Sequence, residues 1–303
     1  MRSAMAGLEL VPLDTAEADA YWKAFVAGRN DLASPNFVVH LEHYLAQPPE
    51  DQRAYFAFKE NGRVVGTVRI GGAKPGEPSN VLSFFSLVPE ARGWDRDAVL
   101  AAAEPMIANG ASSIVASYDD TYSEVFTKLG FQERFARMRM EVPLSRRDKP
   151  AVPMAHPEAT DVEDIATFLM AVYDGHMEQP FGLHVGPPAE WRDYMTSIWK
   201  GVSGTYTPLA SWLARDDAGL AGASLVSTWM GTPLLAELGV RKDRRGQGLG
   251  RALVTATMNA LIDLGYDRLS LYVTLGNDPA IRLYEGLGFR QAGGRTLSAV
   301  LEL

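Results

Sequence analysis

Apolar residues in the second half of the chain recur with helical spacing in some segments and as short runs in others. Between 249 and 264 they fall at 249, 253, 256, 260 and 264, the spacing of one helix face. Further helices are predicted over 162–172, 188–199 and 279–285, and strands over 209–215, 220–229, 234–240, 268–273 and 296–303. Strands that alternate with helices predict an α/β fold.

The first half follows the same order of elements. Landmarks recur at near-constant offsets: 156 residues separate Gly66 from Gly222, 153 separate Arg92 from Arg245, and 158 separate Gly130 from Gly288. Such offsets predict the duplication of one domain, with a chance likeness of two α/β units as the alternative.

Residues 145–157, SRRDKPAVPMAHP, break the pattern near the middle of the chain with three prolines. Proline removes a backbone donor and restricts the residue before it, so this segment is predicted to be an extended linker. The predicted domains are therefore 1–144 and 158–303.

Composition narrows the class of protein without identifying it. Of the 303 residues, 47% are hydrophobic and 22% are charged, values typical of a soluble globular protein. The net charge of -8 argues against a general affinity for nucleic acid, and the absence of cysteine excludes disulfides, thiolate metal sites and a cysteine nucleophile. With no apolar run of membrane-spanning length and no signal-peptide pattern near Met1, we expect a cytoplasmic protein without a membrane partner.

The most informative stretch is 240–253, VRKDRRGQGLGRAL, in which an apolar strand leads into glycines at 246, 248 and 250 and then a helix. Glycine permits close backbone approach to a ligand, and the first N–H groups of a helix attract an anion such as a pyrophosphate. The stretch lacks the Gly-Lys-Ser/Thr of a Walker A loop and the spacing of a dinucleotide fingerprint. A tight strand-to-helix turn without a ligand is the structural alternative.

Two motifs in this half resemble a known family. The pattern Arg245-x-x-Gly248-x-Gly250 is similar to the acyl-CoA-binding loop of the GNAT superfamily of N-acyltransferases, and the stretch 277–289, NDPAIRLYEGLGF, resembles its second motif. The resemblance implies two tandem GNAT-like domains, each a mixed, mostly antiparallel sheet flanked by helices, with acetyl-CoA as co-substrate.

The family's roles carry over to matching positions of this chain. The resemblance implies a pyrophosphate site at Arg245, Gly246, Gln247, Gly248, Leu249, Gly250 and Arg251, and a pantetheine site at Leu238, Val240 and Asn277. It also implies that Tyr284 protonates the departing CoA thiolate.

The general base is less well marked in the sequence. The family often has a glutamate where this chain has Leu234, and Glu237 is the one carboxylate on that strand. By alternation Glu237 points to the face opposite Leu234, although a bulge could re-aim it. Its alternatives are a solvated position or an ion pair with Arg241.

Candidate contacts to the acceptor amine lie in two segments. His176, Glu178 and His184 belong to a Gly/Pro-rich stretch between two predicted helices, and Tyr118 and Asp119 follow a strand of the first half. Acidic groups suit a cationic amine, although loop residues of this kind are commonly only surface residues. No cluster of His or carboxylate residues has metal-ligand spacing, so no metal is predicted.

The first half departs from the family's chemistry. Asp95 and Asp97 stand where the second and third glycines of the loop would be, and carboxylates there repel a pyrophosphate. We therefore expect one active half, which transfers an acetyl group to a primary amine of a small molecule. Acylation of a peptide or protein amine, and acyl-CoA sensing without turnover, remain the alternatives; the oligomeric state is not predicted.

Overall fold

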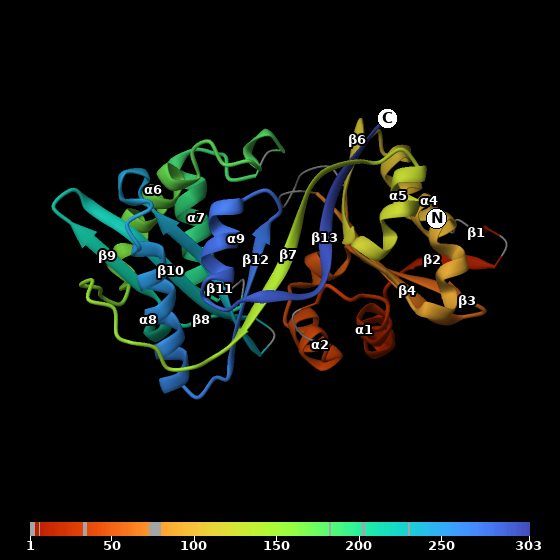
Figure 1. Ribbon diagram of the computed structural model, residues 1–303. Coiled ribbons are helices and arrows are strands. Elements are labelled where there is room, and N and C mark those ends of the chain that lie inside the picture. Colours follow the sequence, from red (N-terminus) through yellow and green to blue (C-terminus); the bar gives the residue numbers. More distant parts are fainter. Residues whose placement is uncertain are drawn as a thin grey trace. The chain divides into compact units, whose positions relative to one another are not determined.

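The computed structural model describes residues 4–5, 7–32, 35–72, 80–181, 183–201, 204–229 and 231–303. The chain forms two compact units (Figure 1). Unit 1 comprises Met1–Met138 together with Gly293–Leu303, and unit 2 comprises Arg139–Ala292.

Unit 1 has a mixed sheet in which neighbouring strands follow the order β1-β2-β3-β4-β5-β6-β13. The strands are β1 (Ala4–Met5), β2 (Leu8–Pro12), β3 (Tyr55–Glu60), β4 (Arg63–Gly71), β5 (Val81–Leu87), β6 (Ser113–Asp119) and β13 (Arg290–Glu302). The α-helices are α1 (Ala18–Ala27), α2 (Phe37–Leu45), α3 (Pro49–Gln52), α4 (Asp95–Ala108) and α5 (Ser123–Lys128). The β5–β6 pair is parallel and the pairs β2–β3, β3–β4, β4–β5 and β6–β13 are antiparallel.

Unit 2 has the strand order β7-β12-β11-β10-β8, with β9 also paired to β10. The strands are β7 (Gln132–Pro143), β8 (Thr205–Tyr206), β9 (Trp212–Asp216), β10 (Gly219–Trp229), β11 (Thr232–Val240) and β12 (Arg268–Thr274). The α-helices are α6 (Val162–Tyr173), α7 (Pro188–Trp199), α8 (Leu249–Asp263) and α9 (Asp278–Glu285). The predicted elements of the second half are therefore present, with shifts of a few residues at their ends.

The last strand of the chain belongs mainly to unit 1, although the sequence repeat implied that it completes the second half. Residues Thr296–Glu302 of β13 pair antiparallel with β6 in unit 1 (Figure 1). The second part of β7 lies beside β12 in unit 2, where Ser270 donates to Glu141 at 3.2 Å. The compact units thus differ from the predicted ranges 1–144 and 158–303. The boundaries between the units fall inside β7 and inside β13, the final strands of the two ranges.

The proline-rich segment forms no helix or strand apart from one bridge, and it is attached to unit 2. The backbone N–H and C=O of Arg147 both bond the Asn259 side chain of α8 at 3.0 Å. Farther along, Ala155 forms a bridge with Leu213 of β9. The segment is therefore part of the packing of unit 2 and is not a free tether.

One irregularity of the unit 2 sheet leaves part of a strand edge unpaired. In the fully described strands β11 and β12, the parallel register is recorded at Leu234 and Ser270 alone, near the start of each strand. A bulge between Leu225 and Val226 of β10 shifts the antiparallel register to β11 at the same level. The strands β11 and β12 therefore separate beyond Leu234, which leaves one edge of β11 without a paired strand.

Close packing holds β11 against its helices. Along β11 buried and partly buried residues alternate, as expected for a strand with two different faces. Gly239 has no room for a side chain, since an added Cβ would lie 2.8 Å from the Phe168 ring of α6. No helix among the described residues is long and apolar enough to cross a membrane.

Candidate active site

The free edge of β11 presents backbone groups of two predicted residues. The Arg241 N–H bonds the Ala221 carbonyl of β10 at 2.9 Å. Since alternate residues of an antiparallel strand face opposite edges, the backbone groups of Leu238 and Val240 point away from β10. They face the gap toward β12, and the Val240 carbonyl accepts from Arg245 Nε at 3.1 Å. This edge can add an extended amide-containing chain as an extra strand.

The glycine loop that follows has the backbone predicted for an anion site. Gly246 and Gly248 have φ of 74° and 83°, a region that residues with side chains adopt at a cost. The amide of Ala252 bonds back to the Gly248 carbonyl at 3.0 Å, so the amides of Leu249, Gly250 and Arg251 precede the first helical hydrogen bond of α8. These amides and the helix dipole together favour a phosphate.

The side chains beside the loop support its shape. Gln247 Nε2 donates to the Asp243 carbonyl at 2.8 Å, and Arg251 Nη1 donates to the Gly286 carbonyl at 3.0 Å. Arg245 also reaches the Val172 carbonyl at the end of α6. The two guanidinium groups thereby lend positive charge to the loop while fixing the elements around it.

Asn277 and Tyr284 lie at opposite ends of α9. Asn277 is the N-cap, and its side-chain oxygen accepts from the Ala280 amide at 3.4 Å. Tyr284 is 8% exposed, and burial first, then the negative charge of Glu237, raise its pKa well above the usual tyrosine value. Its hydroxyl therefore keeps its proton at neutral pH, as a proton donor must.

Glu237 is 4% exposed, and its carboxylate accepts hydrogen bonds from two tyrosines. The Tyr173 hydroxyl donates to Glu237 Oε2 at 2.6 Å, and the Tyr194 hydroxyl donates to Oε1. Burial and the adjacent carboxylate raise the pKa of Tyr173. The two alternatives from the sequence are wrong, since Glu237 is not solvated and Arg241 pairs with Asp216 instead.

Sequence reasoning missed both tyrosines. Tyr173 is the last residue of α6 and Tyr194 lies in the middle of α7, and neither belongs to a recognisable motif. Only the fold of the two helices against β11 brings them to one carboxylate.

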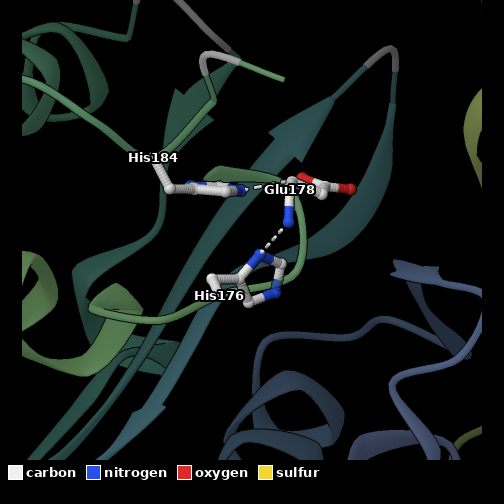
Figure 2. A group of neighbouring side chains, drawn as sticks. All are labelled: His176, Glu178 and His184. Atoms are coloured by element: carbon white, nitrogen blue, oxygen red, sulfur yellow. Dashed lines mark hydrogen bonds and ion pairs between the residues drawn. The ribbon is translucent and has the colours of Figure 1, made fainter. Parts of the chain in front are cut away.

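The acceptor candidates of the second half do gather at one place (Figure 2). Glu178 is fully buried, and its two oxygens accept from His184 Nε2 at 2.9 Å and from Thr274 Oγ1 at 2.6 Å. His176 Nδ1 accepts from the Glu178 amide at 3.3 Å, and the His184 ring stacks on Tyr173 with centroids 4.1 Å apart.

One ligand atom from each of His176, Glu178 and His184 lies within 4.8 Å of the others. The spacing along the sequence, from which no metal was predicted, did not reveal this cluster. The spacing along the chain has no periodic form, and the loop brings the three groups together by folding back between α6 and α7.

The candidates of the first half have structural roles in unit 1. Tyr118 is 1% exposed and stacks on Phe126. Asp119 is fully buried, and its carboxylate accepts from the amides of Asn30, Asp31 and Thr121 at 2.8–3.0 Å. These contacts favour support of the unit's own loops over contact with a substrate.

In unit 1, other side chains occupy the positions that correspond to Glu237 and Val240 of unit 2. By the offset of 153 residues, Phe84 stands at the place of Glu237, and it packs on the rings of Trp22, Phe25 and Tyr55. The Tyr122 hydroxyl accepts from the Leu87 amide at 2.6 Å, at the strand end that corresponds to Val240. The groups that would receive a ligand are thus occupied by the chain itself.

The sequence of the second half matches a family. Residues 169–289 match the model of the Acetyltransferase (GNAT) family. This part of the chain is therefore similar to the GNAT acetyltransferases. The GNAT motifs predicted at 245–251 and 277–289 both lie within the matched range.

Curated relatives match over part of their length. The mycothiol acetyltransferase of Clavibacter sepedonicus is 32% identical over 151 residues, which are 49% of this chain and 46% of the relative. That of Propionibacterium freudenreichii subsp. shermanii is 29% identical over 178 residues, 55% of this chain and 54% of the relative. The chain thus aligns with about half the length of these GNAT relatives.

Solved structures match the fold over nearly the whole chain. A GCN5-related N-acetyltransferase from Sphaerobacter thermophilus has a TM-score of 0.75 at 16% identity and covers 99% of this chain and 97% of its own. A tandem GNAT protein from the clavulanic acid biosynthesis pathway has a TM-score of 0.68 at 20% identity, with 97% and 98% covered. The predicted α/β fold of two tandem GNAT-like domains is therefore confirmed.

Proposed function

We propose that unit 2 transfers an acetyl group from acetyl-CoA to a primary amine of a small molecule, by direct attack in a ternary complex. The observation that carries this proposal is the open backbone edge at Leu238 and Val240, which leads directly into the glycine loop of α8. This edge can pair with an extended arm that contains amides, and the loop amides can bind a diphosphate at the end of that arm. CoA has this form.

The donor is held in three parts. The pantetheine arm pairs with the backbone of Leu238 and Val240 and reaches the Asn277 side chain. The pyrophosphate lies on the amides between Gly246 and Arg251, where the helix dipole and guanidinium groups offset its charge. The thioester then lies near Tyr284, whose pKa is raised in part by Glu237, so both groups face the same region of the unit.

The reaction needs one proton removed and one supplied. Glu237 accepts a proton from the bound ammonium group, directly or through a hydroxyl of its tyrosine partners. The neutral amine attacks the thioester carbonyl carbon, the C–S bond breaks, and the sulfur leaves as a thiolate. Tyr284 donates its proton to that sulfur, so the products are an amide and CoA.

A small-molecule acceptor is favoured over a peptide. The curated relatives carry the name mycothiol acetyltransferase, and mycothiol is a small molecule. In this chain the buried carboxylate of Glu237 suits a cationic amine, and Tyr173, which donates to it, stacks on Trp191 with ring centroids 5.7 Å apart. The tyrosine-held carboxylate also favours a catalyst over a sensor, because binding CoA alone requires no base.

Two measurements test the proposal. Calorimetric titration should show one acetyl-CoA bound per chain, with free phosphate as a weak competitor. Release of free CoA should then depend on added amine in a panel of amino sugars, diamines and lysine-containing peptides. Tight binding without release with any amine would support the sensor, release with peptides alone would support the protein-modifying alternative, and no binding would refute the whole assignment.

A further inference from the structure

The loop between α6 and α7 gathers a set of side chains that metal ions bind. His176, Glu178 and His184 lie within nine residues of each other and supply two imidazoles and one carboxylate (Figure 2). This donor set is used by zinc sites that keep a position open for water or a substrate group. Imidazole with carboxylate also suits other divalent transition metals.

The donor atoms of the three side chains lie near the separations that a bound ion requires. In a tetrahedral site, donor atoms that each lie about 2.1 Å from the ion are about 3.4 Å apart. One donor atom of each of the three side chains already lies within 4.8 Å of the others, and His184 Nε2 is 2.9 Å from Glu178 Oε2. A closing of the widest pair by at most about 1.4 Å therefore converts the cluster into a coordination sphere.

The surroundings hold these groups in place. Thr274, at the end of β12, donates to the Glu178 oxygen that His184 does not use, and such a second bond orients a ligating carboxylate. The His184 ring lies parallel to Tyr173, and Glu178 has no exposed surface. A divalent cation would also offset the cost of burying that carboxylate.

We propose that His176, Glu178 and His184 bind one divalent transition-metal ion, with Zn²⁺ as the probe that the donor set fits best. The bound ion fixes the loop that follows Tyr173, and so it supports the ring that donates to Glu237. Its remaining coordination position takes water. The proposal does not depend on acetyl transfer, since the three ligands come from one loop of unit 2.

Zn²⁺ titration of the chelator-treated full chain tests the site. We expect one Zn²⁺ per chain, and at least about tenfold weaker binding in His176→Gln and in His184→Gln. His43→Gln, a histidine on α2 of unit 1, serves as the control and should bind as the original chain does. Absence of stoichiometric Zn²⁺ binding, or equal loss in the control, overturns the proposal.

A second measurement needs no variant. X-ray absorption of the zinc-loaded chain should show two imidazoles and oxygen ligands around the metal, and Co²⁺ in its place should give the visible absorption of a four- or five-coordinate site. A shell of water oxygens alone overturns the proposal. Loss of acetyl transfer with intact Zn²⁺ binding would refute the proposed function and leave this site standing.

Discussion

Replacing Glu237 with glutamine separates a base from a structural carboxylate. The change keeps the volume of the side chain and removes its charge. In the original chain both oxygens accept from a tyrosine hydroxyl. Glutamine can accept from one of them through its oxygen, while its NH₂ group meets the oxygen of the other. The packing of Tyr173 and Tyr194 is therefore retained, and the capacity to take a proton is lost.

A structural role and a role as general base predict different effects of Glu237→Gln on stability and on kcat. A hydrogen bond to a charged group contributes about 1.5–3 kcal/mol and a neutral one about 0.5–1.5 kcal/mol. The two weakened bonds therefore cost about 2 kcal/mol of stability, and relief from burying a charge offsets part of this. Loss of a general base lowers kcat about 10²–10⁴-fold, which corresponds to about 2.7–5.4 kcal/mol in the barrier.

The assay is amine-dependent release of CoA as a function of pH, with thermal unfolding of the same samples. Glu285→Gln, an exposed neighbour of Tyr284 on α9, is the matched control. We expect Glu237→Gln to lose both the rate and the acidic limb of the profile, while the control keeps both. Less than about a tenfold loss in kcat, with an unchanged acidic limb, would refute the role of Glu237 as the base.

The alkaline limb gives an internal check on the same variant. The charge of Glu237 contributes to the raised pKa of Tyr284, after the larger effect of burial. A raised pKa keeps the hydroxyl protonated to higher pH, so the rate should fall only above the ordinary tyrosine value of about 10. Glu237→Gln should move this limb to lower pH, whereas an unmoved limb would argue against an effect of the Glu237 charge on Tyr284.

Three further experiments test the proposed proton donor, the glycine loop and unit 1. Tyr284→Phe should lower kcat by about 10²-fold or more and leave the calorimetric affinity for acetyl-CoA unchanged; equal rates would remove Tyr284 from the mechanism. Gly248→Ala and Gly265→Ala place a Cβ at nearly equal φ, 83° and 85°, in open space. Each should therefore cost about 1–2 kcal/mol in stability, but only the first should weaken acetyl-CoA binding. Tyr122→Phe strands the buried Leu87 amide and should cost about 1–3 kcal/mol in denaturant unfolding, with no change in acetyl-CoA affinity; a changed affinity would place a CoA site in unit 1.

Local patterns in the sequence were sufficient to predict the helices and strands of unit 2 and the backbone of the glycine loop. Helical spacing predicted α8 from Leu249, and the structure begins that helix directly after Gly248. The left-handed backbone at Gly246 and Gly248 follows from residue type, because glycine adopts it without the cost that a Cβ imposes. The motif around Tyr284 placed it on a helix near the C-terminus, and burial there agrees with its spacing.

Tertiary structure decided which residues meet. The sequence could not show that Tyr173 and Tyr194 share the carboxylate of Glu237, because the contact joins two helices to a strand more than 40 residues away along the chain. Nor could it show that His184 turns back onto Glu178, since a loop without periodicity carries no rule for side-chain direction.

The exchange of final strands has the same origin. An alternating strand such as β13 specifies a face to bury and a partner edge to fill, and it does not specify which sheet offers that edge. Residue type and spacing thus determined where this chain forms helices, strands and a glycine-rich turn. Packing decided the contacts of Glu237 with its two tyrosines, the histidine cluster and the pairing of β13, because those contacts depend on distances that exist only in the folded chain.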